Sequence, residues 1–440
     1  MNKEIKQRIE QLNNGKIPKG YQKTDFGVFP SDWETDKTLG DLFDFYGGLS
    51  KSRDELGEEG YAYLHYGDLH RGTFNSASID QYEQLPKCDI SLTGKEMCLM
   101  KDGDVAFLDA SEDLEGTSRA VLIDNPENKP FIAGLHIIYG KAKNNNLDKW
   151  FKQYITSSES VKKQFQRLAV GFKVYGVNRD TISRIKVAFP SSQKEQSRIA
   201  DILMKWDKAI ELYDKQIDAL TRYKAVCLKK MFPIKGQAVP EWRFQGFSGD
   251  WEQRKVGQVL VERNEQSPKS TEYPLMAFIA NEGVAPKGER YDRSALVNDT
   301  ENKLYKKTEY GDFIYSSNNL ETGSIGLNKH GKATISPVYS IFQPTGIADS
   351  DFLGRRLVRK DFINEMVRWR QGVVYGQWKI HESDFLKIEI CVPSVQEQRQ
   401  IGLFLDKLDN LITLHQRKKE VITNQRKTLQ QYLLNGIIRV

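Results

Sequence analysis

Two stretches of the chain, 189–232 and 392–440, carry apolar residues at alternating steps of four and three. That spacing places the apolar side chains along one seam of a helix, as in a coiled coil. The seam residues of the first stretch are Ile199, Leu203, Trp206, Ile210, Ile217 and Leu220. Those of the second stretch are Ile401, Leu405, Leu408, Ile412 and Ile422. The pattern predicts two helices of about 40 residues, each roughly 60 Å long.

Because the two predicted helices have matching seams, the simplest arrangement is that they pair with each other. The alternative is that each packs on its own domain as an ordinary core helix. Lys224, Lys419 and Arg426 interrupt the seams. Polar residues at such positions suit exposure, control of the helix register or the docking of a partner.

The two helices begin with nearly the same sequence, "FPSSQKEQSRIADIL" at 189–203 and "VPSVQEQRQIGLFL" at 392–405. Each copy contains Ser-x-x-Glu after a proline, which is typical of a capping box at a helix start. In such a box the serine oxygen accepts from a free backbone N–H, and the glutamate reaches back to the cap. The chain therefore carries a repeat, and we expect each copy to start a long helix.

The repeat extends upstream more weakly. "FPSDWE" at 29–34 corresponds to "FSGDWE" at 247–252, and "KDGDVAF" at 101–107 resembles "EYGDFIY" at 309–315. Between these segments the two halves differ strongly. The two halves are similar at their ends and different in their middles. This pattern favours two modules that recognise different targets and share one common scaffold.

Short apolar runs separated by turn residues fill each middle region and predict strands. A helix is predicted after the strands of each half, over 147–168 and 351–372. Trp33 and Trp251 read as packing residues at the start of each module. The predicted order is an N-terminal helical segment (1–19), module 1 (20–188), the first long helix (189–232), a linker (233–246), module 2 (247–391), and the second long helix with the C-terminus (392–440).

This organisation resembles the specificity subunit of type I restriction-modification systems, over essentially the whole chain. The resemblance rests on the duplicated "EQ" helix start after two dissimilar modules, and on the openings "FPSDWE" and "VPEWRFQGFSGDWE". It implies an α+β fold: two mixed α/β target recognition domains, separated and joined by two long helices that form an antiparallel intramolecular coiled coil. Antiparallel pairing would give an approximate two-fold axis and equivalent docking surfaces for two partner subunits.

The resemblance also implies the function and the partners. Each recognition domain would read one half of a bipartite, gapped site in double-stranded DNA, and the helices would act as the spacer. Two methyltransferase subunits, carrying S-adenosylmethionine, and restriction subunits, using ATP and magnesium, would bind to this frame. The chain itself would hold no cofactor, no metal and no catalytic residue. Half-sites on one face of DNA lie about 34 Å apart per helical turn, which helices of roughly 60 Å can span.

Candidate DNA contacts are basic, amide and aromatic residues that cluster in predicted loops, because phosphates bind Lys and Arg and base edges bind Arg, Asn and Gln. In module 1 they are Lys51, Arg53, His70, Arg71, Lys173, Tyr175 and Arg179. In module 2 they are Lys287, Arg290, Tyr291, Arg293, Asn318, Asn319, Tyr375, Gln377 and Lys379. Taken singly, the alternative for each is an ordinary solvated surface charge, or for a tyrosine a core position.

The two alternative functions are an enzyme that cuts or modifies DNA alone, and a coiled-coil adaptor with no role on DNA. "GLNKHGKAT" at 326–334 nearly spells a phosphate-binding loop, but Ala333 stands where Ser or Thr would bind magnesium. Glu-x-Lys pairs, typical of some metal-dependent nucleases, occur at Glu127/Lys129 and Glu301/Lys303 in polar turns. The usual amino-methyltransferase tetrapeptide and zinc-ligand spacing are missing from the sequence.

Charge and cysteine content change this picture little. The formal net charge is +6, which permits an anionic partner without demanding one. The four cysteines form no CxxC pair and suit free thiols, and the sequence has neither a signal peptide nor an apolar run long enough to span a membrane. We therefore expect a cytoplasmic protein.

Overall fold

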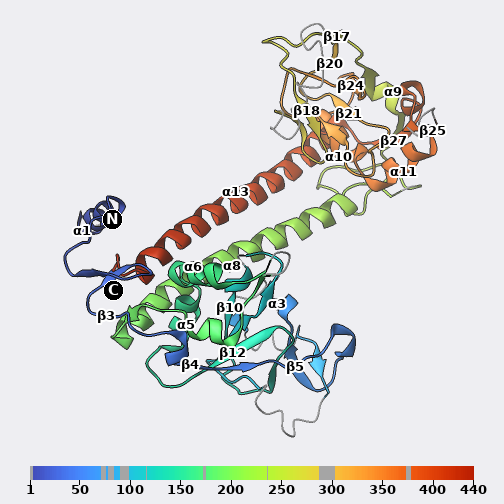
Figure 1. Ribbon diagram of the computed structural model, residues 1–440. Helices are drawn as coiled ribbons and strands as arrows, with labels where there is room; N and C mark the ends of the chain where they lie inside the picture. The colour runs from blue at the N-terminus through green and yellow to red at the C-terminus, as the bar shows by residue number, and fades with distance from the viewer. Residues whose placement is uncertain are drawn as a thin grey trace. The chain divides into compact units, whose positions relative to one another are not determined.

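The computed structural model describes residues 3–70, 76–77, 84–89, 99–114, 116–171, 175–234, 236–286, 303–372 and 378–440. The chain divides into two compact units (Figure 1). Unit 1 comprises Met1–Asp214 together with Lys418–Val440, and unit 2 comprises Lys215–Arg417. Each unit therefore contains one recognition module and part of both long helices, α8 (Gln193–Lys230) and α13 (Val395–Leu434).

Unit 1 is built on a five-stranded sheet of order β4-β12-β8-β10-β6. Its strands are β4 (Phe43–Gly47), β12 (Ile137–Ala142), β8 (Val105–Leu108), β10 (Ala120–Ile123) and β6 (Ser76–Ala77), antiparallel except for the β10–β6 pair. A second sheet has the order β11 (Phe131–Ala133), β5 (Tyr61–Leu64) and β7 (Lys87–Cys88). Two-stranded sheets join β1 (Tyr21–Lys23) to β2 (Val28–Pro30), β3 (Trp33–Glu34) to β14 (Phe189–Pro190), and β9 (Ala110–Ser111) to β13 (Tyr175–Gly176).

The helices of unit 1 contribute buried residues to its cores, except for the first, which buries none. They are α1 (Lys3–Asn13), α2 (Leu39–Leu42), α3 (Tyr66–His70), α5 (Lys149–Thr156), α6 (Glu159–Leu168) and α7 (Arg179–Ser183), with short 3-10 turns at Arg53–Glu55 and Gly116–Ser118. Phe107 of the sheet stacks on Phe165 of α6, and Phe151 of α5 lies in the same core. The single helix predicted over 147–168 is wrong, because the chain breaks at Ser157 and the side chain of Ser158 caps α6.

Unit 2 repeats this plan with a four-stranded sheet of order β16-β24-β21-β22. Its strands are β16 (Leu260–Glu262), β24 (Ser340–Pro344), β21 (Phe313–Tyr315) and β22 (Ile325–Leu327). The smaller sheets pair β17 (Gln266–Ser267), β20 (Tyr305–Thr308) and β23 (Ala333–Ile335); β18 (Ala277–Ile279) with β19 (Gly283–Ala285); β15 (Glu252–Lys255) with β27 (Glu389–Val392); and β25 (Gln371–Gly372) with β26 (Trp378–Lys379). Its short helices are α9 (Val256–Val259), α10 (Ser350–Leu357), α11 (Lys360–Arg368) and α12 (Glu382–Phe385). The single helix predicted over 351–372 is also wrong, because the chain breaks between α10 and α11 and the last two residues of that range form β25.

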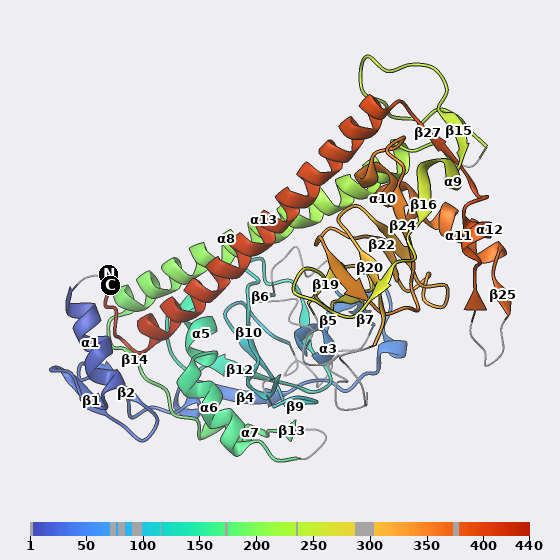
Figure 2. The same ribbon diagram turned by 90° about the horizontal axis from the view of Figure 1, so that it is seen from above.

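The long helices pair in opposite directions within each unit (Figures 1 and 2). In unit 1, Arg426 of α13 binds Asp207 of α8 at 2.8 Å, and Lys419 binds Asp214 at 2.5 Å. Asp214 follows Asp207 in the chain whereas its partner Lys419 precedes Arg426, so the two helices run antiparallel. In unit 2, Lys224 binds Asp409. The residues that interrupt the predicted seams therefore form ion pairs across the helix pair and fix its register. The later seam residues of each helix lie half-buried along the stretch that carries these ion pairs: Ile210, Ile217, Leu220, Ile412 and Ile422. The earlier ones are instead buried in the cores of the modules, Ile199 and Leu203 in module 1 and Ile401, Leu405 and Leu408 in module 2.

The repeated "GD" turn places a buried carboxylate in each unit. In unit 1, Asp104 accepts a hydrogen bond from the backbone of Lys101 at 2.8 Å, and in unit 2 Asp312 accepts one from Glu309 at 2.7 Å. The glycine before each aspartate adopts a positive φ, which suits this tight turn. Burial raises the pKa of Asp104 to about 6 and also raises the pKa of Asp312.

Asp104 is expected to make unit 1 less stable as the pH rises from about 4 to 6. Its folded pKa lies above the value of about 3.9 in an unfolded chain, so the folded protein keeps a proton that the unfolded chain has lost in this window. The Asp104→Asn variant should lack this decline, which amounts to roughly 2–3 kcal/mol. Urea unfolding of both proteins between pH 4 and 7 measures it, with the exposed Asp44→Asn as control. A pH-independent difference between the wild type and Asp104→Asn would contradict the assignment.

Candidate nucleic-acid interface

The repeated Glu-Gln pair fastens each module to the start of its long helix. In unit 1, buried Gln196 accepts a hydrogen bond from the backbone N–H of Asp148 at 2.8 Å and donates to the carbonyl of Pro190 at 2.8 Å. In unit 2, buried Gln398 binds Asp349 and Pro393 in the same way, also at 2.8 Å. Asp148 and Asp349 are the N-caps of α5 and α10. The glutamines therefore set where the helices of the modules begin.

The glutamates of the pair bind arginines that lie far away in the sequence. Glu195 accepts from Arg439 at 2.5 and 2.9 Å, and the same guanidinium binds Asp32 at 2.9 and 2.8 Å. These hydrogen bonds raise the pKa of the Arg439 guanidinium above its usual value. Glu397 accepts from Arg243 at 2.8 and 2.7 Å. The sequence predicted that these glutamates reach back to their own caps; instead, both oxygens of each bind an arginine.

In module 1 the candidates near residue 50 lie on one edge of the sheet, in the loop between β4 and β5. Lys51 binds Glu55 at 2.7 Å, and Arg53 binds Asp68 of α3 at 2.7 Å. The hydrogen bond from Lys51 lowers the pKa of Glu55 to about 2. A DNA phosphate would therefore have to displace a carboxylate from each of these cations.

The hydroxyl of Tyr63 ties the loop that carries these cations to the start of β12. It accepts from the backbone of Lys51 at 3.1 Å and of Leu135 at 2.7 Å, and it donates to the carbonyl of Leu49 at 2.6 Å. The cations are thus presented from an anchored loop at the edge of the β5–β11 sheet.

The other described candidates of module 1 lie on the neighbouring hairpin. Tyr175 begins β13, which pairs with β9, and Val170 and Gly176 form a bridge that closes the hairpin. Arg179 is exposed at the start of α7. The backbone N–H of Val177 donates to the carbonyl of Asp109 at 2.8 Å, which fixes the hairpin to the end of β8.

Module 2 carries an equivalent hairpin, β25–β26, at the same place in its frame. The side chain of Asn318 accepts from the backbone N–H of Trp378 at 2.7 Å, so it anchors the hairpin to the loop after β21. Asn319 and Lys379 are exposed beside it. Trp378, which the sequence pattern did not single out, is exposed next to Lys379 and offers a flat surface for a base. Its only signal was an aromatic residue between two polar candidates.

The remaining candidates have no described side chain. Those outside the described residues are Arg71, Lys173, Lys287, Arg290, Tyr291, Arg293, Tyr375 and Gln377. His70 ends α3, but its side chain is not described either. In the sequence, Lys173 precedes β13, and Tyr375 and Gln377 lie between β25 and β26.

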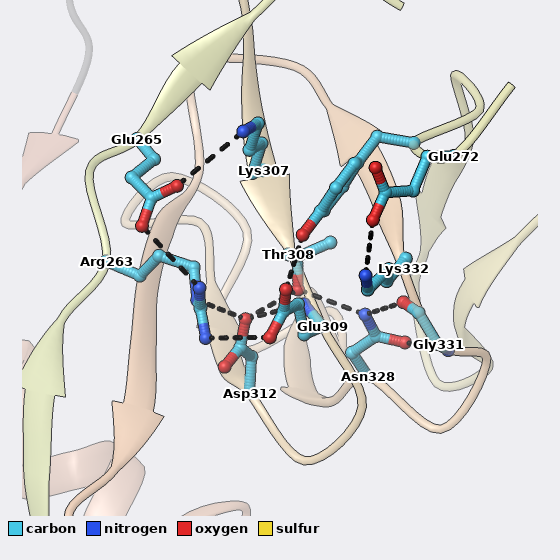
Figure 3. Close-up of polar contacts among 11 residues, drawn as sticks. Arg263, Glu265, Glu272, Lys307, Thr308, Glu309, Asp312, Asn328, Gly331 and Lys332 are labelled. Atoms are coloured by element: carbon cyan, nitrogen blue, oxygen red, sulfur yellow. Dashed lines mark hydrogen bonds and ion pairs between the residues drawn. The ribbon is translucent and has the colours of Figure 1, made fainter. Parts of the chain in front are cut away.

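A polar network in unit 2 occupies the region of the near match to a phosphate-binding loop (Figure 3). Arg263 binds Asp312 at 2.9 Å and Glu309 at 3.4 Å, and Lys332 binds Glu272. The amide of Asn328 accepts from the backbone of His330 at 2.9 Å and Gly331 at 3.1 Å.

This geometry adds to the sequence argument against nucleotide binding at 326–334. The side chain of Asn328 accepts from the backbone N–H groups that would otherwise hold a phosphate. The segment leads into strand β23, whereas a phosphate-binding loop leads into a helix. The lysine is committed to a carboxylate.

The other enzymatic motifs find little support among the residues that the structure describes. Glu127 and Lys129 form an ion pair of 3.8 Å with each other. Glu301 lies outside the described residues. The described part of the chain contains no group of three or more His, Cys, Asp or Glu that could hold a metal ion. Nor does it contain a helix long and apolar enough to cross a membrane.

Comparison with known proteins gives one consistent result. The chain is 22% identical over 430 residues to a putative type I restriction enzyme MjaX specificity subunit of Methanocaldococcus jannaschii, covering 96% of this chain and 97% of that protein. It is 24% identical over 435 residues to the MjaVIII specificity subunit of the same organism, covering 93% and 94%.

Two solved structures share the fold. The type I restriction-modification S subunit from M. genitalium aligns with a TM-score of 0.56 at 17% identity, over 91% of this chain and 96% of that one. A chain from a structure of type I restriction-modification complex assembly and conformational transition aligns with a TM-score of 0.53 at 14% identity, over 93% and 99%. A family model described as the type I restriction modification DNA specificity domain matches residues 30–222 and again 248–424. The chain therefore belongs to the type I restriction-modification DNA specificity family and carries two copies of its domain.

Proposed function

We propose that this chain is the non-catalytic subunit that reads a bipartite, gapped DNA site, with each module reading one half. The proposal rests on a contrast between two parts of each unit: the contacts that join the module to its long helix, which we call the frame, and the loops at the edge of the module. The frame contacts of Gln196 and Gln398 are the same in both units, whereas the anchored loops at the module edges carry different residues. A shared frame with different edges suits two readers of different sequences.

The edges have the chemistry that this role needs. Each contains cations for phosphates and amides or aromatic rings for bases, on short loops and hairpins. A backbone hydrogen bond from Val177 to Asp109 ties down the hairpin of module 1, and the side chain of Asn318 ties down that of module 2. Anchored elements of this kind hold side chains in place before DNA arrives, which favours sequence discrimination.

In-vitro selection from random duplexes tests the proposal. The chain, purified together with its methyltransferase partner subunits, should enrich two constant segments separated by a fixed gap. A stand-alone enzyme would instead methylate or cut DNA when purified alone. A coiled-coil adaptor without a DNA role would enrich nothing and would be insensitive to salt in the presence of DNA.

The Lys379→Ala variant should bind every DNA sequence more weakly, because an exposed lysine on β26 is suited to a phosphate rather than to a base. The slope of log K against log salt should become less steep by about 0.9, the value for one phosphate contact. Fluorescence anisotropy between 50 and 200 mM salt, a range in which phosphate contacts dominate, measures it. Lys407→Ala on α13 is the control, and an unchanged slope for Lys379→Ala would contradict the phosphate role.

We further propose that two methyltransferase subunits and the restriction subunits bind this chain and supply the chemistry. S-adenosylmethionine, ATP and magnesium would then be bound by those partners. Exposed apolar residues on the long helices support such docking: Leu212 and Val421 in unit 1, and Leu403, Leu411 and Leu414 in unit 2. Leu212 and Leu414 occupy the same position in the repeat, as binding of two identical partners requires.

A further inference from the structure

His136, at the edge of module 1, has a backbone conformation that its side chain disfavours. Its φ is 59°, in the left-handed region, at the third position of a turn that the backbone of Ile137 closes onto Gly134 at 3.2 Å. Glycine is the usual residue at such a position, because any side chain there is strained. A histidine at such a position, where glycine would be free of strain, suggests that its side chain has a function.

Neighbouring groups hold the imidazole ring in one orientation. Nδ1 lies 3.0 Å from the carboxylate of Asp109, and the ring of Tyr66 meets it edge-on at 5.4 Å and 88°. Tyr66 is in turn packed against His65, with ring centroids 4.4 Å apart. The side chain of His136 nevertheless remains 45% exposed. The ring is thus fixed on one side and open on the other.

In the neutral imidazole, the carboxylate of Asp109 selects the tautomer with the proton on Nδ1, and this determines what the open side can recognise. A neutral imidazole that donates its Nδ1–H to Asp109 has Nε2 as a hydrogen-bond acceptor. In the major groove, the donors that bases present are the exocyclic amino groups of adenine and cytosine. An acceptor fixed in this way discriminates these two bases from guanine and thymine.

His136 lies on the edge that carries the candidate contacts. Asp109, which orients the ring, also accepts from Val177 directly after β13, so that the imidazole and the hairpin of Tyr175 share one anchor. On the other side, Tyr63 ties Leu135 to the loop of Lys51. Cations for phosphates therefore flank a group suited to a base.

Module 2 shows that the common frame does not need this conformation. Gly140 of β12 pairs with Val105, and Phe342 of β24 pairs with Phe313, which are equivalent strand positions. Counting back from them, Val338 takes the place of His136. Val338 is 73% exposed, and its backbone is not among the described residues with a positive φ. The strained histidine thus belongs to one edge and not to the shared frame.

We propose that His136 is a specificity-determining residue of module 1, an inference that rests on the proposed DNA-reading function. Its Nε2 accepts a hydrogen bond from the amino group of an adenine or a cytosine in the major groove. Asp109 is its positioning residue. Tyr66 supports the ring from the side.

The His136→Gly variant tests the proposal, because glycine relieves the strain while it removes the ring. Selection from random duplexes should show that preference at one base pair of one half-site falls roughly 5- to 150-fold, with the other half-site unchanged. The melting temperature should stay equal or rise, whereas a merely structural histidine would lower it. Val338→Gly is the matched control and should leave the module 1 half-site intact.

Two outcomes would overturn the proposal: an unchanged preference at every position, or a uniform loss at all sequences. Should His136→Gly fail to fold, His136→Asn gives the same test, since asparagine tolerates a left-handed backbone and lacks Nε2. A wild-type protein that selects no two-part site would instead refute the proposed function itself. A wild-type site that His136→Gly leaves intact refutes only the role of His136.

Discussion

Replacing residues 256–388 by residues 39–185 of the same chain is expected to give a protein that reads the same sequence in both halves of its site. The two segments begin and end at matched points of the frame. The backbone of Leu39 donates to Ile185, and that of Val256 donates to Ile388, both at 2.8 Å. The donor segment also brings Asp148 to the place of Asp349, ready for Gln398.

This exchange leaves the rest of unit 2 unchanged, including the Glu397–Arg243 ion pair, β15 and β27. Selection from random duplexes measures the result, and the original module 2 half-site should be lost completely. The reciprocal exchange, with 256–388 in place of 39–185, should duplicate the other half-site. Retention of the original module 2 sequence by the first chimera would refute the assignment of one half-site to each module.

Removing the carboxylate of Glu397 is expected to be the most destabilising single change in the frame. Its side chain is 1% exposed and binds the guanidinium of Arg243, itself only 14% exposed, through two hydrogen bonds. The Glu397→Ala variant leaves this arginine without its buried partner, which costs about 3–5 kcal/mol in comparable cases. Urea unfolding monitored by near-ultraviolet circular dichroism should show a loss of this size in unit 2.

Glu252→Ala provides the matched control, because Glu252 pairs with Arg254 at 2.7 Å but is largely exposed. Exposed pairs contribute about 0–1 kcal/mol, so the control should unfold nearly as the wild type does. Equal effects of the two substitutions would mean that the Glu397–Arg243 contact does not hold the module to its helix.

The sequence predicted those parts of the fold that repeat or follow a regular period. The two long helices, α8 and α13, and their antiparallel pairing agree with the structure, since helical periodicity is a local property. The family match and the two-domain organisation are also confirmed. The break between α5 and α6 was missed, because two serines can either continue a helix or cap the next one.

What depended on distant partners could not be predicted. Nothing in the spacing connects Glu195 to Arg439 or Glu397 to Arg243, so the "EQ" pair was interpreted from its neighbours as a capping box. The sequence did not single out His136 as a candidate DNA contact. The features that do so are its positive φ and the carboxylate of Asp109 beside its ring, and both appear only in the structure. The assignment of individual DNA contacts stays a prediction.

Single-molecule sequencing of modified adenines in the host genome tests the central claim most directly, with this gene intact and with it deleted. Expression of the chain and its partner subunits should be verified by mass spectrometry in the intact strain. The account predicts that one two-part motif with a fixed gap loses its methylation on deletion and regains it when the gene is restored. An expressed chain whose deletion removes no motif, or removes a continuous one, would contradict it.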